Sequence, residues 1–449
     1  MDSRNKISSL VVEGLFDAFD YSLRFDKGHP LILTSPNGYG KTTLLRILAA
    51  FRQKDLMYFY LLPFRKITLA LADGSEFRVE ASNMELASEG DEEERQDTSG
   101  RSIVFGHYPP EHTQTPASFV FGEESMLCWQ TELRHVMSSA VTLVDMYVSD
   151  PSAFVERYMR RLLKLLTPAQ DVNNVVARLE SLPDLRIIES QRLYKKVEDR
   201  FNNSGREISE LKETLPVLSE RLKEQLRHVR FGFLIKSQRS DREFIRAILD
   251  NSESIGQQEY ETQSEEIDRK ISRLSRIGLI DRLTLPEYNA DKSYVLKSYL
   301  HDLEGNLREY DDILDKLDLF GDLLARKKLV NKEVEAHVKH GLRIRSTLTG
   351  GFIDLRNLSS GEKNQIILLY DFIFNVPDGA VLLIDEPEIS LHVAWLIDFM
   401  TDLEKIAALK KLTVVVATHS PQVINGRWDY CYDLYEAVSK SAEDEEEPI

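Results

Sequence analysis

The stretch LILTSPNGYGKTTLLRIL, residues 31–48, decides the fold, because an apolar run breaks into SPNGYGKTT and then resumes with helical spacing. A Walker A phosphate loop has the pattern G-x-x-x-x-G-K-[ST], and Gly40, Lys41 and Thr42 fill its last three places. Ser35 stands where the pattern has its first glycine. The stretch therefore predicts a strand, a phosphate loop with one departure, and a helix.

The residue types of this loop suit phosphate binding. Backbone N–H groups must curl around a phosphate, and Gly38 and Gly40 lie where side chains would collide with it. We expect Lys41 to bridge the β- and γ-phosphates of ATP and Thr42 to offer its hydroxyl to Mg²⁺, while the helix start directs its positive dipole end at the anion. The predicted nucleotide-binding residues of the loop are Asn37, Gly38, Gly40, Lys41, Thr42 and Thr43. The alternative is an ordinary glycine turn that happens to contain Lys-Thr.

The composition indicates two or three domains, or one large domain with an insertion, in 449 residues. Acidic residues outnumber basic ones, 74 to 57, and the formal charge of −17 argues against nucleic acid as the main partner. Acidic runs at residues 89–97 and 442–449 are typical of solvated segments. A basic run at residues 157–164 is compatible with a solvated helix face or with a local basic groove.

The cysteine content and the apolar runs indicate a cytoplasmic protein. Cys128 and Cys431 are too few for a disulfide framework and lack metal-ligand spacing. The N-terminus has no apolar core of a signal peptide, and no run of about 18 apolar residues occurs.

Strand patterns surround the phosphate loop. Residues 7–16 and 21–25 read as two strands before it, and residues 63–82 read as a hairpin that turns at Asp73-Gly74. A further short strand is expected at residues 185–188, which leads into Glu189, Ser190, Gln191 and Arg192. These patterns predict an ATPase lobe over residues 1–194.

Leucine spacing changes the character of the chain beyond this lobe. Two amphipathic helices are predicted from the series Leu211, Leu215, Leu218, Leu222 and the series Leu300, Leu303, Leu307, Tyr310, Leu314, Leu317. Residues 195–340 are therefore expected to form a helical, coiled-coil-like insertion whose two arms pack together. An ordinary helical bundle fits the spacing equally well. A second ATPase lobe is predicted at 341–434, followed by an acidic tail at 435–449.

Three further motifs follow in the second lobe. The sequence NLSSGEKNQI places Ser359, Ser360 and Gly361 just before a helix, where hydroxyl and N–H groups can meet a phosphate. AVLLIDEPEISLH predicts a buried strand that ends in Asp385-Glu386, and TVVVATHSPQVI predicts another that leads to His419. The order of the four motifs, rather than any one of them, indicates a nucleotide-binding protein.

In these motifs the chain resembles the ABC-type ATPase heads of the SMC, Rad50, RecF and OLD groups. The resemblance implies an α/β P-loop ATPase head of two lobes with a mixed sheet and an inserted helical domain. It also implies that Asp385 holds Mg²⁺ through water, that Glu386 polarises the attacking water, and that His419 senses the γ-phosphate. Gln191 would contact the nucleotide and link Mg²⁺ to the helical arm, so that the metal residues are Thr42, Asp385 and Gln191.

The resemblance further implies that the chain is an oligomer, at least a dimer. In such heads the LSSGE motif completes the ATP site of the opposite subunit, so Ser360 and Gly361 would contact the γ-phosphate bound by a second copy. ATP then holds the dimer together, and hydrolysis releases it.

The residues after Pro387 indicate which of these groups the chain resembles most. ABC transporters usually have a Thr-Ser-Ala-Leu-Asp run at this place, and this chain does not. After Pro387 the chain continues Glu388-Ile389-Ser390-Leu391-His392, which resembles the OLD-like ATPases of anti-phage systems. About 30 residues follow His419, too few for the TOPRIM nuclease domain of OLD nucleases. The chain is most similar to the AriA ATPases of the PARIS system, with the PtuA ATPases of the Septu system as the rival. The implied partners are a separate TOPRIM-type nuclease such as AriB and a phage-encoded trigger protein. A RecF- or SMC-like ATPase that clamps DNA is the alternative.

Overall fold

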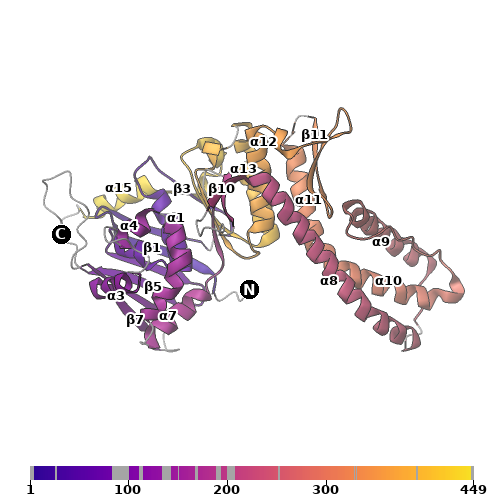
Figure 1. The fold of residues 1–449 in the computed structure, drawn as a ribbon, viewed down its shortest axis with the longest axis horizontal. Coiled ribbons are helices and arrows are strands. Elements are labelled where there is room, and N and C mark those ends of the chain that lie inside the picture. The colour runs from indigo at the N-terminus through magenta and orange to yellow at the C-terminus, as the bar shows by residue number, and fades with distance from the viewer. Residues whose placement is uncertain are drawn as a thin grey trace. The chain divides into compact units, whose positions relative to one another are not determined.

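The structure, a computed structural model, describes residues 5–25, 28–82, 101–110, 115–133, 143–149, 151–166, 170–188, 194–199, 208–250, 253–327, 329, 331–390 and 393–445. The chain forms two compact units (Figure 1). The first comprises Met1–Ser190, Pro377–Ile389 and Leu396–Ile449, and the second comprises Gln191–Val376 and Ser390–Trp395. Gln191 and the acidic run at 89–97 lie outside the described residues.

An antiparallel sheet of six strands forms one layer of the first unit, in the order β2-β1-β4-β5-β6-β7. Buried and less buried residues alternate strictly along β4, which is the pattern of a sheet with one face in the core. The predicted hairpin is confirmed: β4 pairs with β5, and the Ser75 N–H donates to Asp73 Oδ1 (2.9 Å) beside Gly74, whose φ is +84°. The strands are β1 (Ile7–Leu15), β2 (Phe19–Arg24), β4 (Lys66–Leu71), β5 (Glu76–Ser82), β6 (Ser102–Tyr108) and β7 (Ala117–Gly122).

A parallel sheet forms the second layer, in the order β16-β3-β15-β14-β8. Its central strands are buried along nearly their whole length, as parallel strands covered on both faces are. The strands are β3 (Leu31–Thr34), β8 (Leu185–Ile188), β14 (Val381–Asp385), β15 (Thr413–Ala417) and β16 (Cys431–Asp433). Because all five run in one direction, the ends of β3, β14 and β15 meet at one edge of the sheet.

Helix α1 (Lys41–Gln53) lies between the two sheets. The helix is buried on most sides, so its apolar residues are not confined to one face. Phe51 contacts Phe77 and Phe105 of the antiparallel sheet, with ring centroids 6.2 and 5.7 Å away, while α1 also packs against β8, β14 and β15. The core thus fixes the start of α1 next to the edge where the parallel strands end.

Shorter helices complete the first unit. They are α2 (Leu56–Leu61), α3 (Glu123–Leu133), α4 (Leu143–Ser149), α5 (Pro151–Phe154), the π-helical η2 (Val155–Met159), α6 (Arg160–Leu166), α7 (Gln170–Glu180), α14 (Pro421–Ile424), η8 (Trp428–Tyr430) and α15 (Leu434–Glu445). The 3₁₀ turn η7 (Pro387–Ser390) and helix α13 (Val393–Lys410) contribute residues to both units.

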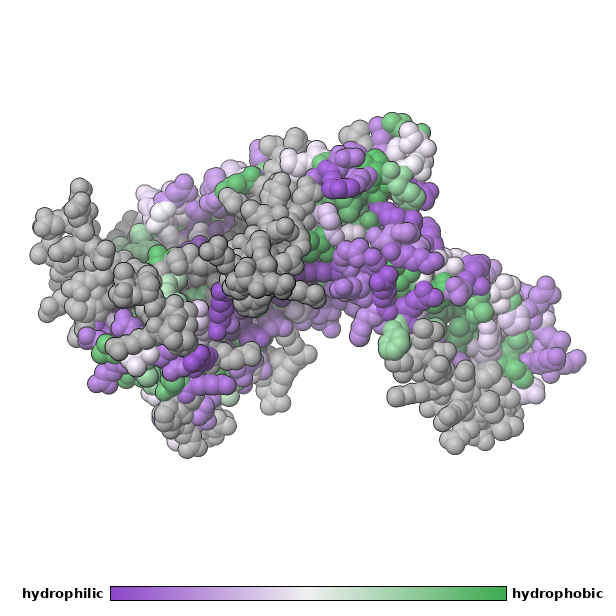
Figure 2. Space-filling view, in the orientation of Figure 1, coloured by the Kyte–Doolittle hydropathy of each residue, from purple (hydrophilic) through white to green (hydrophobic). Residues whose placement is uncertain are grey.

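The second unit contains the long helix α8 (Thr214–Asp250), which packs along α10 (Ser293–Leu307) and against β12 and α12 (Figure 1). The visible surface over the first half of α8 is mostly hydrophilic (Figure 2). Its other elements are β9 (Tyr194–Asp199), β10 (Ile208–Glu213), α9 (Gln257–Ile277), η3 (Ala290–Lys292), η4 (Arg308–Tyr310), α11 (Asp311–Arg326), β11 (Lys332–His337), β12 (Gly341–Ser346), β13 (Phe352–Ile353), η5 (Leu355–Asn357), α12 (Ser360–Tyr370) and the π-helical η6 (Asp371–Asn375).

Both helices predicted from leucine spacing need correction. Leu211 lies in strand β10, because β9 and β10 pair as an antiparallel ribbon before α8 begins. The second series is divided by the 3₁₀ turn η4, which separates α10 from α11. Residues three apart share a face in a 3₁₀ turn, so Leu307 and Tyr310 both stay buried and the spacing continues across the break.

The boundaries expected at 194/195, 340/341 and 434/435 remain a prediction. By contacts, residues 341–376 group with the helices of the second unit. Among the described residues, no helix is both long and apolar enough to span a membrane.

Candidate nucleotide-binding site

The phosphate loop joins β3 to α1 and has left-handed backbone at two glycines. Gly38 has φ +95° and Gly40 has φ +79°, a region that side chains disfavour. A Cβ atom on Gly40 would lie 3.2 Å from Leu15 Cδ2. Ser35 has no positive φ, so the position where the motif departs from its pattern does not require glycine.

The start of α1 is left without a cap from the protein. Gly40 is the N-cap residue, it offers no side-chain acceptor, and the first turn holds no acidic residue. The first N–H groups of a helix have no partner within the helix and carry its positive dipole end. This end of α1 is therefore suited to an anion.

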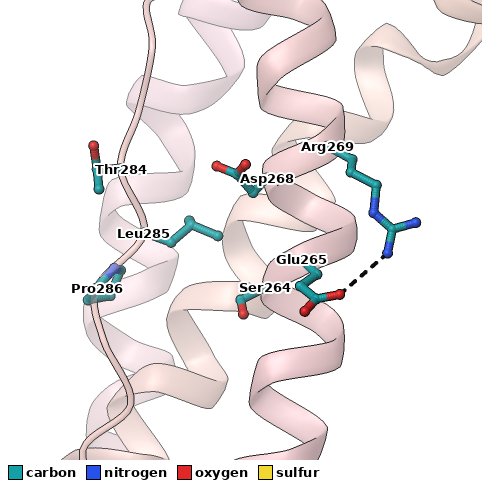
Figure 3. A pocket seen from close by; sticks show the side chains of 7 residues that line it. All are labelled: Ser264, Glu265, Asp268, Arg269, Thr284, Leu285 and Pro286. Atoms are coloured by element: carbon teal, nitrogen blue, oxygen red, sulfur yellow. Dashed lines mark ion pairs between the residues drawn. The ribbon is translucent and has the colours of Figure 1, made fainter.

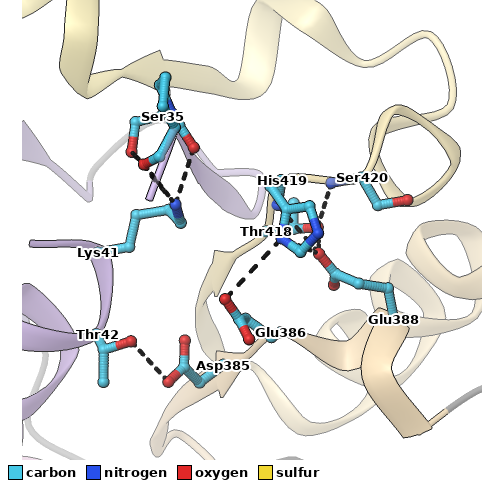
Figure 4. A network of polar contacts seen from close by, with 10 residues as sticks. Ser35, Lys41, Thr42, Asp385, Glu386, Glu388, Thr418, His419 and Ser420 are labelled. Atoms are coloured by element: carbon cyan, nitrogen blue, oxygen red, sulfur yellow. Dashed lines mark hydrogen bonds and ion pairs between the residues drawn. The ribbon is translucent and has the colours of Figure 1, made fainter. Parts of the chain in front are cut away.

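Lys41 is buried at the centre of the site, with 6% of its surface exposed. Its ammonium donates to the carbonyl oxygen of Ser35 at 2.8 Å (Figure 4). It also donates to the carbonyl oxygen of Pro36 at 3.1 Å. Burial lowers the pKa of Lys41, while the nearby carboxylates of Glu386 and Asp385 act in the opposite direction. A phosphate would supply this ammonium with the counter-charge that two carbonyls lack.

Thr42, in the first turn of α1, lies beside Asp385, the last residue of β14. The Thr42 hydroxyl donates to Asp385 Oδ2 at 2.9 Å. A hydroxyl and a carboxylate beside a phosphate-binding helix start are oxygen ligands of the kind that Mg²⁺ takes. The donor set therefore fits Mg²⁺, which Thr42 and Asp385 would hold together with phosphate oxygens.

Glu386 follows β14 with a strained backbone. Its φ is +44°, in the left-handed region that non-glycine residues seldom occupy. The Glu386 N–H donates to the carbonyl of Ala417 (2.9 Å), and the Glu386 carbonyl accepts from Ile389 N–H (3.2 Å). These two bonds hold the side chain at the edge where β14 and β15 end.

His419 follows β15 and lies beside two carboxylates. Its Nδ1 is 3.9 Å from Glu386 Oε1 and 3.1 Å from Glu388 Oε1. Glu388 also accepts from the Thr418 hydroxyl and from the main-chain N–H of His419. Sequence reasoning missed Glu388 and Thr418 as site residues, although a third acidic residue just after Asp385-Glu386 was the available signal.

The predicted signature residues belong to the second unit. Ser359 is the N-cap of α12, and its hydroxyl accepts from the Glu362 N–H (3.3 Å) while the Glu362 carboxylate accepts from the Ser359 N–H (2.9 Å). This reciprocal pair is a capping box. Ser360 is exposed at the first position of the helix, and Gly361 follows it. A Cβ on Gly361 would meet Trp395 at ordinary contact distances of 3.7 and 3.8 Å.

In the first unit the fold brings together most of the predicted catalytic, nucleotide and metal residues. These are Asn37, Gly38, Gly40, Lys41, Thr42, Thr43, Asp385, Glu386 and His419. Gln191 lies outside the described residues, and Ser359, Ser360 and Gly361 belong to the other unit.

A hollow of about 500 Å³ in the second unit differs in character from the Lys41 site (Figure 3). It is lined by Ser264, Glu265, Asp268, Arg269, Thr284, Leu285 and Pro286. Its one pair of opposite charges shown in Figure 3, Glu265 and Arg269, is about three-quarters exposed on both sides. An open surface with exposed charges of this kind lacks the buried charge that distinguishes the Lys41 site.

The parallel sheet, the phosphate loop and the carboxylates at the ends of its strands define an α/β P-loop ATPase head of the ABC type. A family described as "AAA domain, putative AbiEii toxin, Type IV TA system" matches residues 161–425, which is more than half of the chain. The chain belongs to this family.

Solved structures that match the chain include SMC head domains. The head of Pyrococcus furiosus, with an extended coiled coil and bound to the C-terminal domain of ScpA, is 12% identical, with 98% of this chain and all of that chain covered at a TM-score of 0.35. The head from Thermotoga maritima is 11% identical, with 95% and 94% covered at a TM-score of 0.31. Among curated proteins, no sequence matches this chain.

Proposed function

We propose that this protein is an ATPase that works as a nucleotide-gated clamp between copies of the chain. The observation that carries the proposal is the convergence of Lys41, Thr42, Asp385, Glu386 and His419 at one edge of the parallel sheet. The family match to an AAA domain supports nucleotide use.

The chain's own residues divide the work. The N–H groups at the start of α1 and the Lys41 ammonium bind the phosphates, and Thr42 and Asp385 would hold the metal ion. Bound Mg²⁺ would neutralise charge on the β- and γ-phosphate oxygens. Glu386 accepts a proton from a water whose oxygen bonds to the γ-phosphorus as the bond to ADP breaks. His419 is the group that contacts the γ-phosphate.

The clamp requires a second copy. Ser360 and Gly361 of one copy would contact the γ-phosphate bound by the other, a role supported by their accessible position at the start of α12. ATP would then join two copies, and hydrolysis would separate them.

The effector is a separate protein in this proposal. The family description names a toxin and a type IV toxin–antitoxin system, which supports a role in anti-phage defence. We propose that the ATP-bound assembly holds a TOPRIM-type nuclease, as AriA holds AriB in the PARIS system, until a phage-encoded protein triggers its release. A small TOPRIM gene beside this one would support that partner, whereas a replication or repair operon would favour a DNA clamp.

Mixed assemblies test the clamp. Lys41→Ala removes the phosphate contact of one site, and Gly361→Asp places a carboxylate against the γ-phosphate of the partner's site. Gly305→Asp is the matched control, because it adds the same charge in α10 of the same unit, where nothing lies within 4 Å of an added Cβ. Lys41→Ala and Gly361→Asp are each expected to be inactive alone, while Gly305→Asp stays active.

In a mixed dimer both lesions fall on one composite site and leave the other intact. ATPase activity is therefore expected to return when the two variants are mixed. Normal hydrolysis by Gly361→Asp alone would contradict the clamp, and normal ATP binding by Lys41→Ala in calorimetry would contradict the nucleotide site itself.

A further inference from the structure

Glu388 makes three contacts through a single oxygen atom. Its Oε1 accepts from the Thr418 hydroxyl (2.8 Å) and the His419 main-chain N–H (3.0 Å), and it lies 3.1 Å from His419 Nδ1 (Figure 4). One carboxylate oxygen thus fixes both the backbone and the ring of His419.

The other oxygen of Glu388 is unusual for a structural carboxylate. The side chain is only 9% exposed, and Oε2 is buried with no hydrogen-bond partner among the described residues. Leaving a buried carboxylate oxygen unpaired is unfavourable, and the neighbouring acids Asp385 and Glu386 add repulsion. A residue kept for stability alone would be better replaced by a neutral one, which points to a role in the chemistry.

The ring of His419 has two acidic neighbours that compete for the same atom. Glu388 Oε1 is 0.8 Å closer to Nδ1 than Glu386 Oε1, by the distances of 3.1 and 3.9 Å. If Nδ1 turned to Glu386, the imidazole would occupy the carboxylate that must accept the proton from water. While Nδ1 is held by Glu388, the opposite ring edge with Nε2 is left for a ligand.

We infer that Glu388 is a positioning residue, which holds His419 away from Glu386 and so keeps the Glu386 carboxylate available to the attacking water. The inference rests on the proposed ATPase function and gives a role to a residue that the four motifs leave without one. The competing interpretation is that Glu388 merely ties the turn at 387–390 to the loop at 418–420, in which case its loss would lower stability without a specific effect on turnover.

A double-mutant cycle separates these interpretations. Glu388→Gln keeps an acceptor oxygen but removes the charge, and His419→Gln removes the ring. Glu404→Gln is the matched control, since that carboxylate pairs with Arg427 (2.7 Å) in the same unit and takes no part in the site. ATP affinity, KM, kcat and the melting temperature are measured for each variant.

We expect Glu388→Gln to lower kcat roughly tenfold to a hundredfold while KM changes little. The double variant should be no slower than His419→Gln alone, because Glu388 acts through that ring. Glu404→Gln should keep the wild-type kcat. Two results would overturn the inference. One is a double variant whose loss of kcat is the product of the losses in the two single variants, and the other is an unchanged kcat in Glu388→Gln.

A readout that needs neither turnover nor a variant of Glu388 tests the contact itself. In protein labelled with ¹⁵N-histidine, with the His419 signals assigned by their loss in His419→Gln, the inference requires a proton on Nδ1. A bare Nδ1 in the wild-type protein would refute the contact. If the wild type fails to hydrolyse ATP, the proposed function is wrong while the contact is still judged by this spectrum; if it hydrolyses ATP and the cycle is additive, only the inference fails.

Discussion

Two helix starts that the sequence assigns to phosphate binding differ in how the protein satisfies them. α1 begins after Gly40 with no capping side chain and no acid in its first turn. α12 begins with Ser359 and Glu362 in a capping box, and Lys332 adds an ion pair to Glu362 (2.6 Å).

The difference indicates how much of each helix start is left for a ligand. The hydroxyl of Ser359 already accepts from a backbone N–H of α12, so a phosphate there would meet chiefly Ser360 and the N–H groups of the first two positions. At α1 the ligand is the only cap. We expect α1 to bind nucleotide within one copy and α12 to add a smaller contact.

The largest expected effect comes from giving α1 an acid of its own. Thr43→Glu puts a carboxylate in the first turn, where it interacts favourably with the helix dipole but repels phosphate. ATP affinity should fall at least about a hundredfold, or about 2.7 kcal/mol, without a lower melting temperature. Calorimetry with ATP measures the affinity, and Thr43→Gln controls for size. Wild-type affinity in Thr43→Glu would show that the anion binds elsewhere.

The start of α2 offers a third case, in which a buried side-chain cap makes the stability of the protein depend on pH. Asp55 caps it by accepting from the Tyr58 N–H (3.0 Å), and its other oxygen accepts from the Tyr147 hydroxyl (2.7 Å). Burial raises the pKa of Asp55 to about 6, despite these hydrogen bonds. Because the folded state binds this proton more tightly than the unfolded state, the stability it confers is present below about pH 4 and is lost as the pH rises through about 6.

We expect this group to lower the free energy of unfolding by about 2 kcal/mol between pH 4 and pH 7. Asp55→Asn keeps acceptor capacity and removes the titration. Urea unfolding of both proteins across this range isolates the contribution as a difference. Parallel stability curves would show that the Asp55 carboxylate is not buried against α2 in solution.

The smallest expected effects come from substituting the two serines at the start of α12, one of which is the N-cap and the other the first residue of the helix. Ser359→Ala removes the cap and should cost about 1 kcal/mol of stability. Ser360→Ala should leave the melting temperature unchanged but lower ATPase activity of the assembly roughly tenfold, through one lost hydrogen bond to a charged group. Thermal melts and steady-state ATPase assays report the two quantities. The same loss of stability for both variants would remove the distinction between cap and contact.

The sequence predicts the first unit well where local chemistry is decisive. β1, β2, β3, α1 and the turn at Asp73-Gly74 follow from alternation, helical spacing and turn residues. The strands that end in Asp385 and near His419 can be recognised from sequence, since each is a short apolar run followed by polar residues. In the sheet β15 pairs with β3, and β14 pairs with β15.

The features that the sequence does not predict depend on contacts between segments that are distant in the chain. Glu388 gains its role only because η7 lies beside the loop after β15, which no local pattern reveals. The break between α10 and α11 is hidden because Tyr310 packs on Phe233 of α8, with ring centroids 4.9 Å apart, and so continues the apolar series through the turn.

The backbone of Glu386 has a consequence for how this position tolerates mutation. Glycine and asparagine adopt a φ of +44° more readily than glutamate does, so both would relax the chain at the point where it needs a carboxylate. The backbone conformation at residue 386 therefore favours glycine or asparagine, whereas the proposed chemistry favours glutamate. If Glu386 has the proposed catalytic role, the substitutions that abolish hydrolysis include those that the folded backbone accepts most easily. A lineage freed from the need for hydrolysis would then lose this glutamate without losing its structure.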